Sequence, residues 1–208
     1  MKGIQAGSIF ACYGTDYVSR LISLGTASTI LYPHIGPSHV AIAADYDGRG
    51  LHWFETTSMC PSKCLYHGDY KYGAQVHHIE RRIEDYTSKG GKVYVYNPNE
   101  YFELDEQQSA RLAKMMYKFL VNETVYDTTG AIFSASRVAQ LLPTFPNSGI
   151  DDLFCSEQLA FVLQCLCLKN KSNPSRYNPG RLLREILYHS VYYVDTVYTK
   201  EGSKCLVG

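Results

Sequence analysis

The sequence has no net charge and no long hydrophobic run, and its number of cysteines is odd. Its 208 residues include 20 Lys and Arg against 20 Asp and Glu, and without a basic stripe we expect no nucleic-acid partner. No apolar run approaches the roughly 20 residues that cross a bilayer. The first residues lead into no apolar stretch of the signal-peptide kind. These absences predict no integral membrane association and, by default, a cytoplasmic location.

The seven cysteines do not form the pattern of a disulfide framework. Their odd number and the missing signal peptide favour reduced thiols, and most of them are expected to be small buried hydrophobes. Tyrosine, by contrast, is abundant, with 18 residues. Its ring and hydroxyl suit both protein cores and the walls of grooves.

The hydrophobic pattern predicts more strands early in the chain and more helices late. The clearest local structure is a hairpin, in which strands over 38–44 and 51–57 flank a turn-rich stretch. Further strands are predicted at 6–14, 74–82, 92–98 and 190–198, and helices at 15–26, 105–121, 131–142, 153–168 and 180–189. This segregation indicates an α+β fold with a mostly antiparallel sheet packed against helices. We expect one domain over 1–208, with 200–208 as a frayed tail.

One cysteine stands where the helix predicted over 153–168 begins. A free thiol has a pKa of about 8.5, and the unpaired N–H groups and dipole of a first helical turn lower it. The same N–H groups can hold the oxyanion of a tetrahedral intermediate. Cys155 is therefore the predicted nucleophile, whereas Cys165 and Cys167, about three turns later, are predicted to be core or packing residues.

A nucleophilic thiol needs a base, and His39, at the start of a strand among small residues, is the best candidate. If Ala44 faces Gly50 across the hairpin, His39 lies opposite Glu55. A register shifted by one residue places Thr56 there instead. The partner across the hairpin would fix the tautomer and orientation of the imidazole. A core histidine with one hydrogen bond, and a solvent-facing Glu55, are the alternatives that the residues alone leave open.

Together these elements resemble the YiiX-like proteins, the circularly permuted branch of the NlpC-type papain-fold hydrolases. In that branch the histidine strand precedes the cysteine helix. The matching segments follow in this order from about residue 6 to 165: AGSIFACYG, SRLISLG, PSHVAIA, HWFETTS, VYDTTGAIF and LFCSEQLAFVL. The chain departs from the family at Gly7-Ser8, where Gly-Asp is usual, and this departure does not touch the three residues above.

The resemblance implies a permuted papain-like fold with Cys155 as nucleophile, His39 as base and Glu55 as the polar third member. Tyr126, from a matching Tyr-Asp pair, and Ser38 are expected to line the pocket. The implied function is a cysteine-dependent amide hydrolase, a peptidase or amidase without a cofactor. It would act through a thiol acyl-enzyme on a peptide-like or other acyl substrate, such as cell-wall-type peptides or isopeptide bonds.

Three alternatives compete with this hypothesis. The same fold can serve a lipid-type acyltransferase or thioesterase, or a non-catalytic binding module. A zinc site is the third, because Cys60, Cys64 and His67 lie close together in a predicted loop, and a histidine at 52, 77 or 78 would complete the set. That motif lacks a second closely spaced ligand pair, so we expect no metal.

Overall fold

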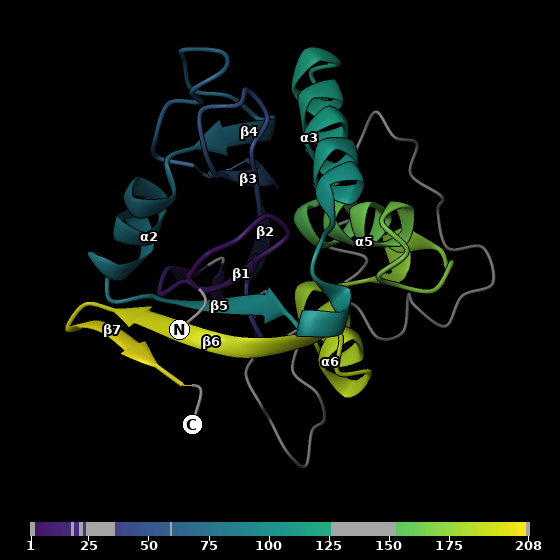
Figure 1. Ribbon diagram of the computed structural model, residues 1–208. Helices are drawn as coiled ribbons and strands as arrows, with labels where there is room; N and C mark the ends of the chain where they lie inside the picture. Colours follow the sequence, from purple (N-terminus) through teal and green to yellow (C-terminus); the bar gives the residue numbers. More distant parts are fainter. Residues whose placement is uncertain are drawn as a thin grey trace.

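The computed structural model describes residues 3–17, 19–20, 23, 36–58, 60–125 and 153–206. A seven-stranded sheet runs through it in the order β4-β3-β2-β1-β5-β6-β7, with every neighbouring pair antiparallel (Figure 1). The strands are β1 (Ile9–Tyr13), β2 (His39–Ala44), β3 (His52–Thr57), β4 (Gly73–His77), β5 (Lys92–Pro98), β6 (Tyr192–Thr199) and β7 (Gly202–Cys205). The helices are α2 (Ile79–Thr87), α3 (Glu106–Val121), α5 (Cys155–Cys165) and α6 (Pro179–Tyr188), with 3-10 turns η1 (Glu100–Phe102) and η3 (Pro174–Arg176). The predicted α+β class and antiparallel sheet are confirmed.

Helices cover both faces of the sheet, with α2 on one side and α3, α5 and α6 on the other (Figure 1). Alternation along β1 sends Phe10 to the α2 face and Ile9 to the opposite face, so the inner strands are buried on both sides. On the α2 face, Phe10 stacks on Trp53 at a centroid distance of 4.1 Å. The larger core lies on the other face, where α5 packs against β2.

The ends of two helices follow from their local sequence. Asp105 and Gln108 form a capping box at the start of α3, in which each side chain accepts from the other's backbone N–H. At α6 the Asn178 side chain accepts from the Arg181 N–H, and Pro179 occupies the first helical position. Both helices match their predicted ranges to within a residue or so.

Two predicted segments are corrected by the structure. Residues 79–82, expected as strand, belong to α2, because Ile79, Ile83 and Tyr86 repeat at helical spacing and face the sheet. The tail expected to fray contains β7, which pairs with β6 through Val197 and Lys204. Strand β7 is short and polar, so it carries no alternating hydrophobic signal.

The predicted hairpin forms, but its register differs from the expected one. Ala44 pairs with His52 rather than Gly50, a shift of two residues. Because side chains alternate with a period of two, such a shift leaves every side chain on its expected face. Glu55 therefore stays on the same face of the sheet as His39.

Two other predicted helices lie partly or wholly outside the described residues. Of the helix expected over 15–26, residues 17, 19, 20 and 23 are helical and the remainder is mostly undescribed. The helix expected over 131–142 lies outside the described residues. Within the described ranges, no helix combines the length and hydropathy that a bilayer crossing requires. All seven cysteines are free thiols.

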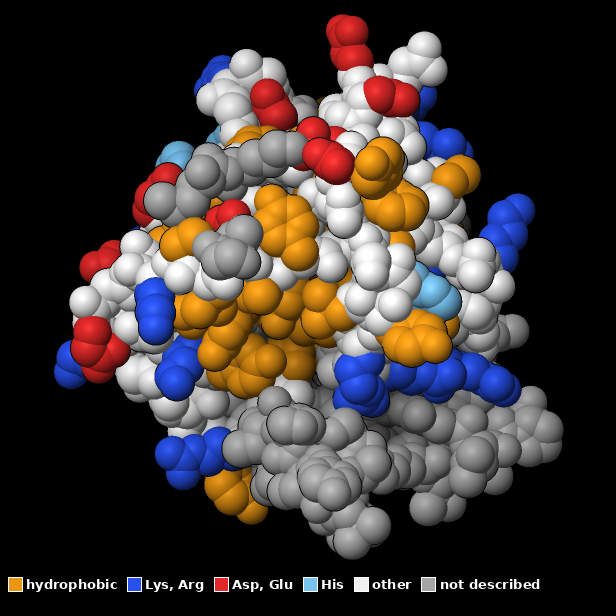
Figure 2. Space-filling model, turned by 60° about the horizontal axis from the view of Figure 1, so that its bottom comes forward, with side chains coloured by type: hydrophobic (Ala, Val, Ile, Leu, Met, Phe, Trp, Pro, Cys, Tyr) orange, Lys and Arg blue, Asp and Glu red, His pale blue; other side chains and the backbone are white. Residues whose placement is uncertain are grey.

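The surface carries much of the tyrosine. Tyr101 and Tyr188 are 85% and 84% exposed. On the face shown in Figure 2, hydrophobic side chains gather into a patch with Lys and Arg side chains at its margin.

Candidate active site

Cys155 is the first residue of α5, as predicted. The preceding Phe154 has extended backbone and no polar side chain to cap the helix, so the first-turn N–H groups remain available to an anion. The Cys155 sulfur accepts from the backbone N–H groups of Val40 and Ser156. It is only 5% exposed. The helix start therefore holds this sulfur against strand β2.

The structure brings His39 to that sulfur. The imidazole interacts with the Cys155 sulfur, and its Nε2–H donates to Glu55 Oε2 at 2.6 Å. Burial alone lowers the pKa of His39, but the Cys155 thiolate and then Glu55 outweigh it and raise that pKa to about 9. Burial likewise raises the pKa of Cys155, yet the neighbouring imidazolium brings it below its ordinary value. These opposite shifts favour a thiolate–imidazolium pair.

Glu55, not Thr56, is the residue that contacts His39. Its carboxylate is 1% exposed and receives Arg82 Nε on Oε1 at 2.6 Å and Arg82 Nη2 on Oε2 at 3.2 Å. Burial raises the pKa of this carboxyl group, but Arg82 and then His39 hold it well below its usual range. A buried carboxylate with both oxygens engaged stays ionised and fixed in orientation.

Arg82 is the site residue that the sequence reasoning missed. It comes from α2, in a stretch expected as strand, and is 3% exposed. Its Nη1 also reaches Asp85 Oδ2 at 3.3 Å, and the Ser62 hydroxyl donates to the same oxygen at 2.7 Å. The available signal was the helical spacing of Ile79 and Ile83, which places Arg82 on the inner side of a helix.

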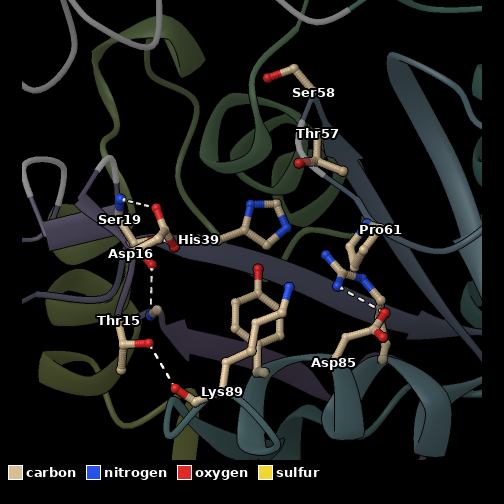
Figure 3. A pocket seen from close by; sticks show the side chains of 13 residues that line it. Thr15, Asp16, Ser19, His39, Thr57, Ser58, Pro61, Asp85 and Lys89 are labelled. Atoms are coloured by element: carbon tan, nitrogen blue, oxygen red, sulfur yellow. Dashed lines mark hydrogen bonds and ion pairs between the residues drawn. The ribbon is translucent and has the colours of Figure 1, made fainter.

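A cavity of about 230 Å³ opens beside His39 on the α2 side of the sheet. Figure 3 shows Lys89 reaching into it toward the His39 ring, with Asp16 and Asp85 on opposite sides. Ser38 is on the wall; its hydroxyl donates to Cys12 O at 3.1 Å. Tyr126, the other expected lining residue, lies outside the described residues. The lining is rich in hydroxyl and charged groups: Thr15, Asp16, Ser19, Ser38, His39, Thr57, Ser58, Arg82, Asp85, Tyr86 and Lys89, with Gly14 and Pro61.

The loop cysteines do not assemble as the zinc hypothesis required. Among the described residues, Cys60 groups with His77 and Glu55 rather than with Cys64 and His67. Its sulfur lies 3.4 Å from His77 Nε2, and burial raises its pKa to about 12, so the thiol is neutral. The Glu55 oxygens in this group are already bound by His39 and an arginine. A second group of possible ligands, Asp45, Asp47 and His52, occupies the hairpin turn.

The other two sulfurs of α5 differ from Cys155 and from each other. Cys165 is partly buried at the helix end. Cys167 is exposed, so its expected packing role is wrong. It follows the helix with φ of 60°, in the left-handed region.

The chain shares its fold with a solved YiiX structure. A crystal structure of the metalloprotein YiiX from Escherichia coli O157:H7 matches it with a TM-score of 0.50 at 19% sequence identity, over 78% of this chain and 66% of that chain. No protein-family model matches the sequence, and no curated protein does. The resemblance to YiiX expected from the motifs is therefore confirmed at the level of the fold, over just under two thirds of the YiiX chain.

Proposed function

We propose that this protein is a cysteine-dependent amide hydrolase, a peptidase or amidase of the circularly permuted papain-like (NlpC-type) kind. The observation that carries the proposal is the continuous chain of contacts from the Cys155 sulfur through His39 to the buried Glu55. A thiol at a helix start, an imidazole and an orienting carboxylate are the parts that nucleophilic acyl transfer needs.

The proposed reaction begins with the thiolate. The Cys155 sulfur attacks the carbonyl carbon, and the electron pair moves to the oxygen, which the N–H groups at the start of α5 stabilise. When the C–N bond breaks, the proton of the His39 imidazolium goes to the leaving amine. The resulting thioester is hydrolysed by water, whose proton passes to His39. Collapse of the second intermediate releases the carboxylic acid and restores the thiolate–imidazolium pair.

The order of the elements supports the permuted arrangement. The strands with His39 and Glu55, β2 and β3, precede the helix with Cys155 by about a hundred residues in the chain. In the unpermuted hydrolases the cysteine helix comes first. The packing of α5 on β2 joins these distant segments into one site.

The chemistry of the cavity supports a polar amide substrate. Its lining offers hydroxyl groups, Lys89 and two carboxylates beside His39, which can bind the polar groups of a peptide. Cell-wall-type peptides and isopeptide-linked chains belong to this class of substrate. A binding module, by contrast, would not need the thiolate.

Alkylation tests the activated thiol directly. Iodoacetamide near pH 6, followed by peptide mapping, is expected to modify Cys155 at least tenfold faster than Cys60, because only the former has a lowered pKa. Equal rates at the two sulfurs would remove the proposal. Cys205, a partly exposed cysteine far from the site in the chain, serves as the reference for ordinary reactivity.

Acyl trapping separates an enzyme from a binding module. Incubation with an activated ester such as p-nitrophenyl acetate is expected to add one acetyl group to Cys155, visible in the intact mass. The Cys155→Ser variant is expected to stay unmodified at that position. A fast-alkylating Cys155 that never forms the thioester would favour the non-catalytic module.

A further inference from the structure

The turn between β2 and β3 contains a group of side chains that the proposed hydrolase does not use. Asp45, Asp47 and His52 each offer one ligand atom, and these atoms lie within 4.8 Å of one another. The turn is at the end of the hairpin away from His39, so this group is separate from the active site.

His52 supplies the observation that points to a ligand. The residue is 8% exposed, and within the part of the chain that the structure describes its Nδ1 has no hydrogen-bond partner. The nearest carboxylate oxygen, Asp47 Oδ1, is 4.0 Å away, which is too far for a hydrogen bond. A buried polar nitrogen without a partner destabilises the folded protein. The Tyr46 ring, edge-on at 5.2 Å, and the His78 ring hold this imidazole in place.

The two carboxylates are oriented by the turn itself. Asp45 Oδ1 accepts from the Gly48 N–H at 2.8 Å, and Asp47 Oδ1 accepts from the Arg49 N–H at 3.1 Å. The closest cation, Arg49, lies 3.8 Å from Asp47 with its side chain 85% exposed, so it neutralises the pair only weakly. Two carboxylates and an imidazole nitrogen therefore converge with little compensating charge.

We propose that Asp45, Asp47 and His52 bind a divalent transition-metal ion of the Zn²⁺ type. Bonds of about 2.0–2.2 Å to oxygen and nitrogen separate neighbouring ligand atoms by about 3–4 Å, so the observed spacing needs only a small contraction of the turn. The imidazole selects against Ca²⁺ and Mg²⁺, which prefer oxygen ligands alone. Solvent completes the coordination. Such an ion ties the two strands together at the turn, whatever chemistry the other end of the hairpin performs.

The test is Zn²⁺ binding by the full chain, stripped with a chelator and titrated in a calorimeter. We expect one high-affinity ion per chain and at least tenfold weaker binding in His52→Gln and in Asp47→Asn. The matched control Asp69→Asn, an acidic residue in the neighbouring loop, should stay within twofold. Arg49→Gln should bind equally or more tightly, because it removes the nearby cation.

Two results would overturn the proposal. One is Zn²⁺ binding that His52→Gln and Asp47→Asn leave unchanged. The other is binding that disappears in Cys60→Ser, since the ion would then lie at the Cys60–His77 pair. Thermal melting adds a second measurement: Zn²⁺ should raise the melting temperature of the wild type and of Cys60→Ser, but not of His52→Gln. Should His52→Gln fail to fold, Asp47→Asn decides, because Asp47 lies on the exposed turn. None of these measurements depends on Cys155 being reactive.

Discussion

At the scale of single residues, burial and charge act in opposite directions on the sulfur of Cys155. Removal from water raises the pKa of a thiol, and a cation in contact lowers it. In this protein the contact with His39 prevails, and the imidazolium in turn depends on the carboxylate of Glu55. The reactivity of one atom thus rests on two neighbours from the hairpin.

Replacing His39 should change the direction of the pKa shift at Cys155. In His39→Gln the imidazolium is gone, burial dominates, and the pKa of the thiol rises above its ordinary value. Since each pKa unit changes the thiolate fraction tenfold at low pH, alkylation near pH 6 should slow at least tenfold. The measurement is the iodoacetamide rate at Cys155 from pH 5 to 9, with Cys205 as internal reference. An unchanged pH profile would contradict the assignment of His39.

Arg82 is expected to act on the site through Glu55. In Arg82→Met the carboxylate stays buried without its guanidinium partner, which costs about 3–5 kcal/mol of the free energy of unfolding. Urea denaturation measures this loss. Arg82→Lys should recover part of it, because it restores the charge but not the two-point contact. The neighbouring Arg81, whose side chain is 61% exposed, gives the control: Arg81→Met should change stability by less than about 0.5 kcal/mol.

The alkylation profile separates this role from a purely structural one. If Arg82 holds Glu55 ionised, then Arg82→Met, when folded, should shift the pH dependence of Cys155 alkylation toward higher pH, and Arg82→Lys, which keeps the charge, should shift it less. A folded Arg82→Met protein with the wild-type profile would show that this arginine serves stability alone.

At the scale of elements, the two ends of helix α5 have different roles. Its start carries the candidate nucleophile, and its end forms a Schellman motif, in which Leu168 N–H donates to Leu163 O and Cys167 N–H to Gln164 O. The residue in the left-handed conformation there is usually glycine, and here it is Cys167, with φ of 60°.

Substitution at this position should stabilise the protein. In Cys167→Gly the steric cost of the left-handed conformation disappears, and even after the added flexibility of the unfolded chain we expect a gain of about 0.5–1 kcal/mol. Thermal or urea unfolding measures it. Cys167→Ala removes the same thiol but keeps the strained conformation, so it should bring no gain. Equal stabilisation by both variants would show that removal of the thiol, and not relief of the backbone strain, causes the gain.

At the scale of the whole molecule, the buried network around Glu55 links pH to stability. The pKa of Glu55 is well below its unfolded value of 4.5. Its contribution to stability is therefore present above that value and is lost as the pH falls through the folded pKa. Because strands β2 and β3 and helix α2 all meet at this carboxylate, its protonation loosens both the hairpin and the helix packed on it.

The comparison with Glu55→Gln tests this linkage. The free energy of unfolding of the wild type should exceed that of the variant at neutral pH, and the difference should shrink as the pH falls below about 4.5. Urea titrations at a series of pH values measure both curves. A difference that stays constant into acid would mean that Glu55 is not ionised in the folded protein.

Local patterns were sufficient to predict most of the elements and the positions of two residues of the candidate site. A cysteine at a helix start and a histidine at a strand start are visible in short windows, because capping, periodicity and the helix dipole act over a few residues. The hairpin also predicted that Glu55 would share a face with His39. That prediction holds although the register was wrong, because the register differs by two residues and side chains alternate with a period of two.

What the amino-acid sequence by itself determined was the class of fold, the helix start beneath Cys155 and the face on which His39 and Glu55 lie. Only the tertiary structure decided that α2 is a helix rather than a strand, that Arg82 reaches Glu55, and that Cys60 meets His77 rather than Cys64. The physical reason is the distance along the chain over which each interaction acts. Periodicity is written into neighbouring residues, whereas a buried ion pair depends on how separate elements pack, which no short window of the chain contains.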